Sequence, residues 1–424
     1  MVQAMSPIDS PKSDAVASPT SQTEPKEPDA FSWKALLSTY LPALVLALGT
    51  GIALPAVPTL AKSFDVSFGV ASGVVSAYML GSVAGTIPTG WLIDRFGLRW
   101  VMILGPVVTS AAALLVSNAH SFTELLILRF IGGCSAQMWV MGRLAAISKN
   151  ASAAQRGRQV SWMFGMDNTG MLAGPLVGGY IASHWGPGAP FFAFSIIALL
   201  ALIPTLVFGE VAAGKPGAPA KKNAVKSTLS MREIVMPRLI FFSLPLFAGL
   251  TRGPVGAGLL HLYAAFTYQL GPVEIGYMAT GAAFLSWPIG FLAGWIMDRF
   301  GRKMTMAPGF AGVAISMILL AISAYLELSL SWYVALFFIA VAMQALTGGS
   351  LQTVGADVAP AEARGTFLGL WRFTGQGGGA LSPIFFALIA DQVNYGAAFL
   401  FTAAAAALIV FLILFRVPET RIGT

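Results

Sequence analysis

The chain has 424 residues, of which 56% are hydrophobic and only 10% are charged. Soluble domains carry about 25% charged residues, so a chain of this length and composition cannot cover itself with a water-compatible surface, and its main solvent must be lipid. The formal net charge of +7 does not indicate nucleic-acid binding here, because the positions of the basic residues follow membrane orientation, and the single cysteine, Cys134, excludes a disulfide framework.

Residues 1–34 are rich in Ser, Pro and mixed charge and have almost nothing to bury, so we expect a disordered tail. They do not resemble a secretory signal, because no short apolar core lies near the start. Twelve apolar segments follow, each long enough to cross a bilayer. The expected spans are 35–58, 68–92, 100–118, 121–147, 160–183 and 188–209, then 238–265, 273–297, 304–326, 329–356, 365–391 and 395–416.

A polar stretch at 211–237 divides the twelve segments into two sets of six. We therefore predict an all-α membrane protein of twelve transmembrane helices, built from two six-helix bundles at 35–210 and 238–416 around a central cavity. Lys and Arg gather in alternate connections, whereas the connections on the other side carry only Lys62. Basic residues favour the cytoplasmic side of a membrane. The predicted cytoplasmic segments include the tail at 1–34, the linker at 211–237 and the end at 417–424.

One charged sequence occurs in both halves of the chain. GWLIDRFGLRW begins at Gly90, and GWIMDRFGRKM begins at Gly294, 204 residues later. Each copy falls between the second and third spans of its half, and Arg156 and Arg364, each followed by Gly, repeat in the same way at a spacing of 208. The halves are therefore a duplicated unit. Two parallel six-helix repeats that face each other across a midplane cavity are a transporter architecture.

The two charged loops can act as conformational latches. A carboxylate at a helix end, such as Asp94 or Asp298, can accept N–H bonds from the start of a neighbouring helix and pair with a nearby Arg. Such a contact forms only when the halves approach on that side, so it would favour one of two conformations. The alternative is a simple topology anchor at the lipid headgroups. The residues of the predicted latch are Gly90, Asp94, Arg95, Gly97, Arg99, Gly294, Asp298, Arg299, Gly301 and Arg302.

Charged side chains inside the membrane are costly unless they are paired or hydrated, so they indicate function. Arg252 lies near the middle of its span, beside Gly253 and Pro254, which should break the helix. We expect Arg252 to bind a carboxylate, a phosphate or another anionic group of the substrate, and the alternative is a structural pair with Asp167. Asp167 is the acid that lies well inside a span, which makes it the candidate proton carrier. Its alternative role is that of a helix-capping or Arg-paired carboxylate.

Further polar residues fall within the expected spans. Arg372 can line the cavity or act as a gate at its cytoplasmic end. Gln344 and Gln376 can face the same cavity, although hydrogen bonds between helices are the alternative for each of them. The predicted substrate contacts are Arg252, Arg129, Arg372, Gln376 and Gln344.

These features resemble the Major Facilitator Superfamily. Both charged sequences are similar to its loop motif G-x-L-x-D-R-x-G-R-K, with Ile296 for Leu in the second copy and Leu98 for Arg in the first. LLILRFIGGC resembles its fourth-helix motif, built on an Arg, here Arg129, with Gly133 four residues on. GMLAGPLVGG resembles the fifth-helix motif of the proton-linked antiporters. The resemblance covers essentially the whole chain beyond the tail.

The resemblance implies two roles. Arg129 would take part in proton coupling, for which we also name Asp167. The glycine-rich segment would form a dry, tightly packed seam that closes the central cavity against ion leak, and ordinary packing of small residues is the alternative. The segment allows a facing backbone to come close, and its proline bends the helix. The residues of this motif are Gly170, Gly174, Pro175, Gly178 and Gly179.

We expect a secondary active transporter that works by alternating access. The glycine motif favours proton-coupled efflux, or antiport, of an anionic or amphiphilic metabolite or drug. The buried arginines Arg129, Arg252 and Arg372, against the one buried aspartate Asp167, favour an anion. The alternative is therefore proton-coupled uptake, or symport, of an organic anion. The sequence contains no phosphate-binding loop, so nothing in it indicates that ATP drives transport. We expect no cofactor and no metal, because His120, His184 and His261 lack metal-ligand spacing.

Other classes of protein fit the sequence less well. A membrane enzyme needs a clustered catalytic set, and the spans hold few His, Asp and Glu residues, so we expect no enzyme. A receptor or scaffold usually adds a large soluble domain. The expected partners are a small-molecule substrate, protons and membrane lipids, with no nucleic acid. We expect a monomer in the inner membrane of a bacterium, with both termini in the cytoplasm.

Overall fold

The computed structural model describes residues 40–150, 153–213, 235–256, 258–360 and 363–417, together with Leu37 and Glu233. The expected tail at 1–34, most of the expected linker at 211–237 and almost all of the expected end at 417–424 lie outside the described residues. All regular structure in the described ranges is helical, as the composition predicts.

The first bundle has six helical segments, two of which are broken into two pieces. Among the described residues, all of them except α7 are long and apolar enough to cross a membrane by length and composition. The fifth segment, α7, is less apolar because Asp167, Asn168 and the motif glycines interrupt it. The segments are α2 (Leu41–Ala53) with α3 (Ala56–Lys62), α4 (Phe68–Phe96), α5 (Leu98–Ser117), α6 (Phe122–Asn150), α7 (Ala153–Trp185), and α8 (Ala189–Leu200) with α9 (Leu202–Ala213).

The second bundle repeats this order, and each of its segments is long and apolar enough to cross a membrane. Together the two sets confirm the predicted architecture of two six-helix bundles. The segments are η2 (Met236–Arg238) with α11 (Leu239–Gly256) and α12 (Leu259–Thr267), α13 (Pro272–Phe300), α14 (Lys303–Tyr325), α15 (Leu330–Leu346) with α16 (Ser350–Val358), α17 (Arg364–Gln392) and α18 (Tyr395–Phe415).

The first segment of each bundle is interrupted in its second half. Pro55 precedes α3, and Gly258, in the left-handed region at φ 95°, precedes α12. Breaks leave backbone groups without helical partners, which a membrane protein tolerates only where they are buried in protein or face a cavity. The two broken ends satisfy this condition because α3 and α12 contact each other between the bundles.

The two charged loops have the same backbone conformation. The helix α4 ends at Gly97, with φ 87°, and α13 ends at Gly301, with φ 100°. Residues with a side chain rarely adopt this region, so the turn from each helix into the next requires glycine at this position. The repeat in the sequence is therefore also a repeat in the structure.

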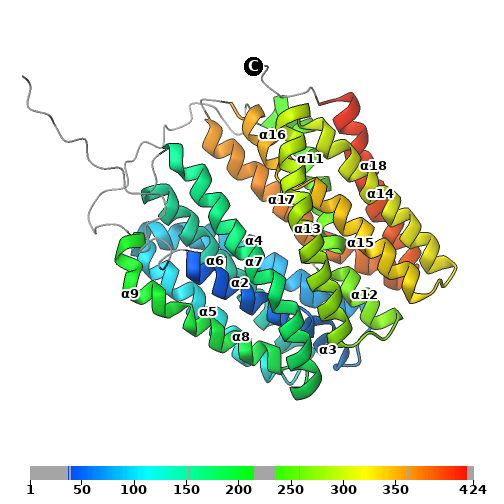
Figure 1. Ribbon diagram of the computed structural model, residues 1–424, viewed down its shortest axis with the longest axis horizontal. Coiled ribbons are helices and arrows are strands. Elements are labelled where there is room, and N and C mark those ends of the chain that lie inside the picture. The colour runs from blue at the N-terminus through cyan, green and yellow to red at the C-terminus, as the bar shows by residue number, and fades with distance from the viewer. Residues whose placement is uncertain are drawn as a thin grey trace, which may run out of the picture.

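The two bundles lie side by side, with α7 against α13 and α4 against α17 (Figure 1). We call the end of the molecule that carries the charged loops, 94–99 and 298–303, the motif face. The other end carries the connections 63–67, 268–271 and 393–394, and we call it the opposite face. In Figure 1, α3 and α12 lie together at the lower right, on the opposite face.

The bundles share an apolar core at the opposite face but have separate cores at the motif face. The shared core joins the bundles through Phe68 of α4, whose ring centroid lies 5.8 Å from that of Phe266 and 5.0 Å from that of Tyr395. At the motif face, one cluster surrounds Met163 in the first bundle and another surrounds Trp371 in the second. The described helices are therefore sealed together at one end only.

Candidate functional site

A cavity of about 470 Å³ lies toward the motif face, mostly within the second bundle. Its walls come from α11, α14, α15, α16 and α17, and Leu144 of α6 reaches it from the first bundle. No Asp or Glu of the described chain lines it, so the lining carries a net positive charge. The polar lining residues are Arg252, Gln344, Thr347, Gln352, Arg372 and Gln376.

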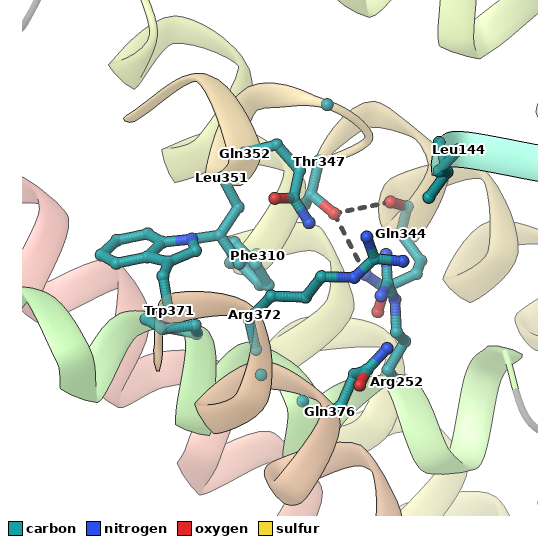
Figure 2. A pocket seen from close by; sticks show the side chains of 15 residues that line it. Leu144, Arg252, Phe310, Gln344, Thr347, Leu351, Gln352, Trp371, Arg372 and Gln376 are labelled. Carbon is teal, nitrogen blue, oxygen red and sulfur yellow. Dashed lines mark hydrogen bonds between the residues drawn. The ribbon is translucent and has the colours of Figure 1, made fainter. Parts of the chain in front are cut away.

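Two arginines face each other in this cavity. Figure 2 shows Arg252 of α11 and Arg372 of α17 pointing toward one another, with Gln344 and Gln376 beside them. Neither guanidinium group has a hydrogen bond or an ion pair with another described residue, and their like charges repel each other. An anionic ligand would relieve this repulsion, because Arg presents paired donors to the oxygens of a carboxylate or phosphate.

The amide of Gln344 is held in place beside the arginines. Its Nε2 donates to Oγ1 of Thr347 at 3.0 Å, and Oγ1 of Thr251 donates to its Oε1 at 3.4 Å. Thr347 lies in the break between α15 and α16 and donates to the carbonyl of Gln344 at 2.7 Å (Figure 2). The amide is therefore preorganised, and the helix break forms part of the cavity wall.

One wall of the cavity is apolar and rigid. Trp371 is 1% exposed, and its ring stacks on Phe367 with centroids 5.8 Å apart. Its indole Nε1 has no hydrogen-bond partner among the described residues. Phe310 and Pro245 continue the same wall. The cavity therefore combines a charged centre with apolar surroundings, which suits an organic anion better than a hydrated inorganic ion.

Asp167 does not lie at this cavity. Its Oδ1 lies 3.2 Å from a guanidinium nitrogen of Arg143 on α6, with side-chain exposures of 20% and 3%, respectively. The guanidinium of Arg143 also stacks over the ring of Trp139 at 4.2 Å. Asp167 therefore has an Arg partner, as its alternative role as an Arg-paired carboxylate requires. The partner is Arg143, whereas Arg252 was the partner considered from the sequence. Sequence reasoning missed Arg143 as this partner, although its position inside the expected span 121–147 could have identified it.

Arg129 is also separate from the first cavity. Its guanidinium lies over the ring of Tyr78 at 4.6 Å and over that of Phe191 at 5.8 Å, and its Nε has no hydrogen-bond partner among the described residues. It lines a different cavity, of about 300 Å³, between the bundles. The structure therefore brings four of the five predicted substrate contacts together and leaves Arg129 elsewhere.

Among the described residues, both charged loops make contacts inside their own bundles. Arg95 stacks over Trp91 at 5.6 Å, and Arg299 stacks over Trp295 at the same distance. In the second copy Arg302 forms an ion pair of 3.2 Å with Asp357 of α16.

The carboxylates of Asp94 and Asp298 are exposed, and neither forms a hydrogen bond or an ion pair with another described residue. A Cβ atom added at Gly90 or Gly294 would meet nothing within 4 Å, so the helix surface beside each loop is open. The predicted latch is therefore not engaged in this conformation.

The glycine motif of α7 packs against two different helices. A Cβ atom at Gly174 would lie 2.7 Å from the Cα of Gly51 on α2, inside the first bundle. A Cβ atom at Gly179 would lie 2.5 Å from the carbonyl oxygen of Pro272 on α13, across the bundle interface. A Cβ atom at Gly276 of α13 would lie 2.6 Å from the carbonyl oxygen of Pro175 in the same seam. Small residues are therefore needed on both sides of α7, because a larger side chain would push backbone against backbone.

Comparison with known proteins identifies the family. The family model of the Major Facilitator Superfamily matches residues 40–255 and 246–424. Tetracycline resistance protein, class B, of Escherichia coli is 28% identical over 362 residues, which cover 82% of this chain and 86% of that protein. Quinolone resistance protein NorA of Staphylococcus aureus (strain MRSA252) is 23% identical over 252 residues, 58% of this chain and 63% of that protein, so this match spans less than two thirds of it.

Solved structures agree with this arrangement of helices. A D-xylose-proton symporter has a TM-score of 0.73 at 19% identity, with 92% of this chain and 98% of that chain covered. A POT family transporter in complex with 5-aminolevulinic acid has a TM-score of 0.72 at 14% identity, with 90% and 95% covered. At such identities the likeness shows the fold alone. From the family model and the fold together, the chain belongs to the Major Facilitator Superfamily of small-molecule transporters and is a multi-pass membrane protein.

Proposed function

We propose that the protein exports a small organic anion in exchange for protons, and that the anion binds between Arg252 and Arg372. The observation that carries this proposal is the cavity in which two guanidinium groups face each other and no described carboxylate offsets their charge. Gln344 and Gln376 would orient the anion, and the wall around Trp371 would contact its apolar part. The site binds an anion better than a cation, because a cation would add to the existing repulsion.

The motif face is the cytoplasmic face in this proposal. Both charged loops lie there, with Arg95, Arg99, Arg299, Arg302 and Lys303, and basic residues favour the cytoplasmic side. The cavity lies toward that face, where the bundles have separate cores. The conformation described above is then the one that loads substrate from the cytoplasm. Both chain termini would lie on the same side, in the inner membrane of a bacterium, and the protein would act as a monomer.

The membrane potential favours export over uptake for such a substrate. One elementary charge that crosses 100 mV changes its free energy by about 2.3 kcal/mol. With the cytoplasm negative, an anion that leaves and a proton that enters both move with the potential. Uptake of the same anion would need enough protons to compensate its charge. The names of the two resistance proteins among the relatives also support export, because export of a drug lowers its concentration in the cell.

Proton coupling is assigned to Asp167. Its carboxylate is mostly buried and faces Arg143, so it can exchange the guanidinium for a proton when the conformation changes. A neutral Asp167 would release Arg143 and alter the packing of α6 on α7. Arg129 would support this step from its position between the bundles. Protons and substrate would then use different sites, coupled through the conformation of the first bundle.

Everted membrane vesicles with an acid interior, reported by a quenched dye, test this proposal. We expect succinate or phenylphosphonate to restore fluorescence, because protons leave as the anion enters the vesicle, and tetraphenylphosphonium to have no effect. Arg252→Ala and Arg372→Ala should each reduce the response at least tenfold. The matched control is Arg416→Ala, an exposed arginine at the end of α18, which should respond as the wild type does.

Two results would contradict the proposal. A response to the lipophilic cation that survives Arg252→Ala would show that the two arginines do not select the substrate. Uptake of the anion by right-side-out vesicles with an inward proton gradient, lost in Arg252→Ala, would replace export with proton-coupled uptake. Asp167→Asn separates coupling from binding, because it should abolish the proton response while succinate still binds.

A further inference from the structure

A second cavity, of about 300 Å³, lies between the two bundles. The first bundle supplies most of its wall, including Val75, Met171 and Phe194, and the second bundle supplies the residues around the break between α11 and α12. Gly256 lines this cavity, and a Cβ atom on Gly256 would lie 3.6 Å from Cγ of Arg252. The second cavity therefore begins about one helical turn beyond the arginine pair, toward the opposite face.

Three polar groups line this mostly apolar space and have unused hydrogen-bonding capacity. His261 is 6% exposed, and neither of its ring nitrogens has a hydrogen-bond partner among the described residues. Its ring packs edge-on against Phe337, with centroids 5.2 Å apart, which fixes the ring beside the cavity. Arg129 lines the same space, and its Nε is also without a partner. The third group is the start of α12, where Gly258 lines the cavity and the N–H groups of the first turn lack helical acceptors.

These groups restrict what can occupy the cavity. An engineered apolar cavity of about 150 Å³ accepts one benzene molecule, so about twice that volume suits a body of two fused rings. A purely apolar occupant would fill the space and leave His261, Arg129 and the helix start without hydrogen-bond partners, which is unfavourable for buried polar groups. A small inorganic anion would leave the apolar wall unfilled. The occupant that satisfies both conditions is a two-ring body that carries an oxygen acceptor at its far end.

We propose that this cavity is a second binding site, which holds the oxygen-bearing aromatic body of the exported anion. The site rests on the proposed function in one respect, because the carboxylate of the same molecule would lie between Arg252 and Arg372. The substrate class is then an amphipathic organic acid with two fused rings and a hydroxyl or carbonyl group opposite the carboxylate. Arg252 lines the first cavity and Gly256, one turn further along α11, lines the second, so a molecule whose carboxylate binds Arg252 would extend its rings past Gly256.

Binding to the purified full-length protein in nanodiscs, with three probes, tests this second site. The probes are succinate, 2-naphthoate and 6-hydroxy-2-naphthoate. Val75→Trp and Met171→Trp fill the cavity from two different helices, so one of them can fail to fold without ending the test. We expect each to weaken 6-hydroxy-2-naphthoate at least tenfold and to change succinate less than twofold. Fillers that leave the naphthoates unaffected, or weaken succinate equally, would overturn the proposal.

His261→Phe tests the polar end of the site with little change of shape. We expect the wild type to bind 6-hydroxy-2-naphthoate about fivefold more tightly than 2-naphthoate. In His261→Phe this preference for the hydroxylated probe should disappear, while 2-naphthoate binds as it does to the wild type. A preference that persists in this variant would contradict the role of His261.

Failure of the proposed function has a different signature. If Arg252→Ala leaves all three probes unchanged while the cavity-filling variants still exclude the naphthoates, the second site stands and the arginine pair is not the anion site.

Discussion

The opposite face and the motif face of this transporter are built from the same helices but hold them together differently. At the opposite face, several polar contacts cross between the bundles. Asp391 at the end of α17 accepts hydrogen bonds from Oγ of Ser67 at 2.8 Å and from the backbone N–H of Gly69 at 2.9 Å, and Lys62 donates to the side chain of Gln269. Among the described residues at the motif face, the ion pairs Arg143–Asp167 and Arg302–Asp357 each join helices of one bundle.

This difference explains which end is sealed. A carboxylate at the start of a helix is stabilised by the free N–H groups and the positive end of the helix dipole. Asp391 makes this contact with the start of α4 from an exposed position, next to Phe68 of the shared apolar core. The predicted latch would be its counterpart at the other end of the same helix pair, where Asp94 at the end of α4 would meet the start of α17. One helix pair would then carry alternating contacts at its two ends.

The largest effect is expected from a side chain added to the seam. In Gly179→Val the new Cβ atom would lie 2.5 Å from the carbonyl oxygen of Pro272, so α7 and α13 must separate. We expect transport to fall more than tenfold, because the opposite face cannot close. Labelling of an engineered cysteine near that face, in a Cys134→Ser background, should become faster. Gly369→Val is the matched control, because a Cβ atom there meets nothing within 4 Å. Normal transport by Gly179→Val would show that this seam does not have to close.

The buried pair of Arg143 and Asp167 inside the first bundle should affect the stability of that bundle. Arg143→Gln removes the partner of Asp167, and breaking a buried pair costs about 3–5 kcal/mol, with the lower end expected because Asp167 is 20% exposed. Thermal unfolding in detergent measures this loss. The double variant Arg143→Gln with Asp167→Asn should recover part of it, because no charge is then left unpaired. Fully additive effects of the two substitutions would contradict the coupling.

A smaller effect is expected where Asp391 caps α4. Asp391→Asn keeps the shape of the side chain but removes its charge, and such a charge at a helix start contributes about 0.3–1 kcal/mol. We expect the population with an open opposite face to rise about two- to fivefold, measured by distances between spin labels on the two bundles. Glu327→Gln, another exposed acid at the same face, is the control. No shift, or a shift toward the sealed form, would show that the cap does not hold this face closed.

The smallest effect on the present conformation is expected at the motif face. Asp94→Asn and Asp298→Asn remove carboxylates that have no partner among the described residues, so stability should change by less than about 0.5 kcal/mol. Exchange between facing states should nevertheless become slower, and the label distances should shift opposite to those in Asp391→Asn. If both variants exchange between the facing states at the wild-type rate, the loops are not latches and act only as topology anchors.

Sequence reasoning succeeded where a pattern is local or repeated. The two charged loops, the glycine at which each helix ends and the apolar spans all follow from residues that lie next to one another in the chain. Arg252, Arg372, Gln344 and Gln376 could be named as cavity candidates because charged and amide side chains inside a membrane have few alternatives.

Contacts between helices could not be predicted in the same way. The partner of Asp167 was unknown because several arginines were candidates, and only the packing of α6 on α7 selects Arg143. The second cavity was also invisible, because it joins Arg129 of α6 to His261 of α12 across the bundle interface. His261 had been considered only as a metal ligand and set aside. Its significance depends on the lack of a hydrogen-bond partner, which is a property of its surroundings.

The sequence by itself therefore determined that lipid surrounds this protein, that its two halves repeat, where its helices lie along the chain and which charged residues they contain. These properties depend on composition and on spacing along one chain segment, because each helix satisfies its own backbone hydrogen bonds in lipid. The tertiary structure decided which face is sealed, which arginines meet in the cavity and which arginine pairs with Asp167. Those outcomes depend on the angle and depth at which helices from distant parts of the chain pack, and no local pattern records that geometry.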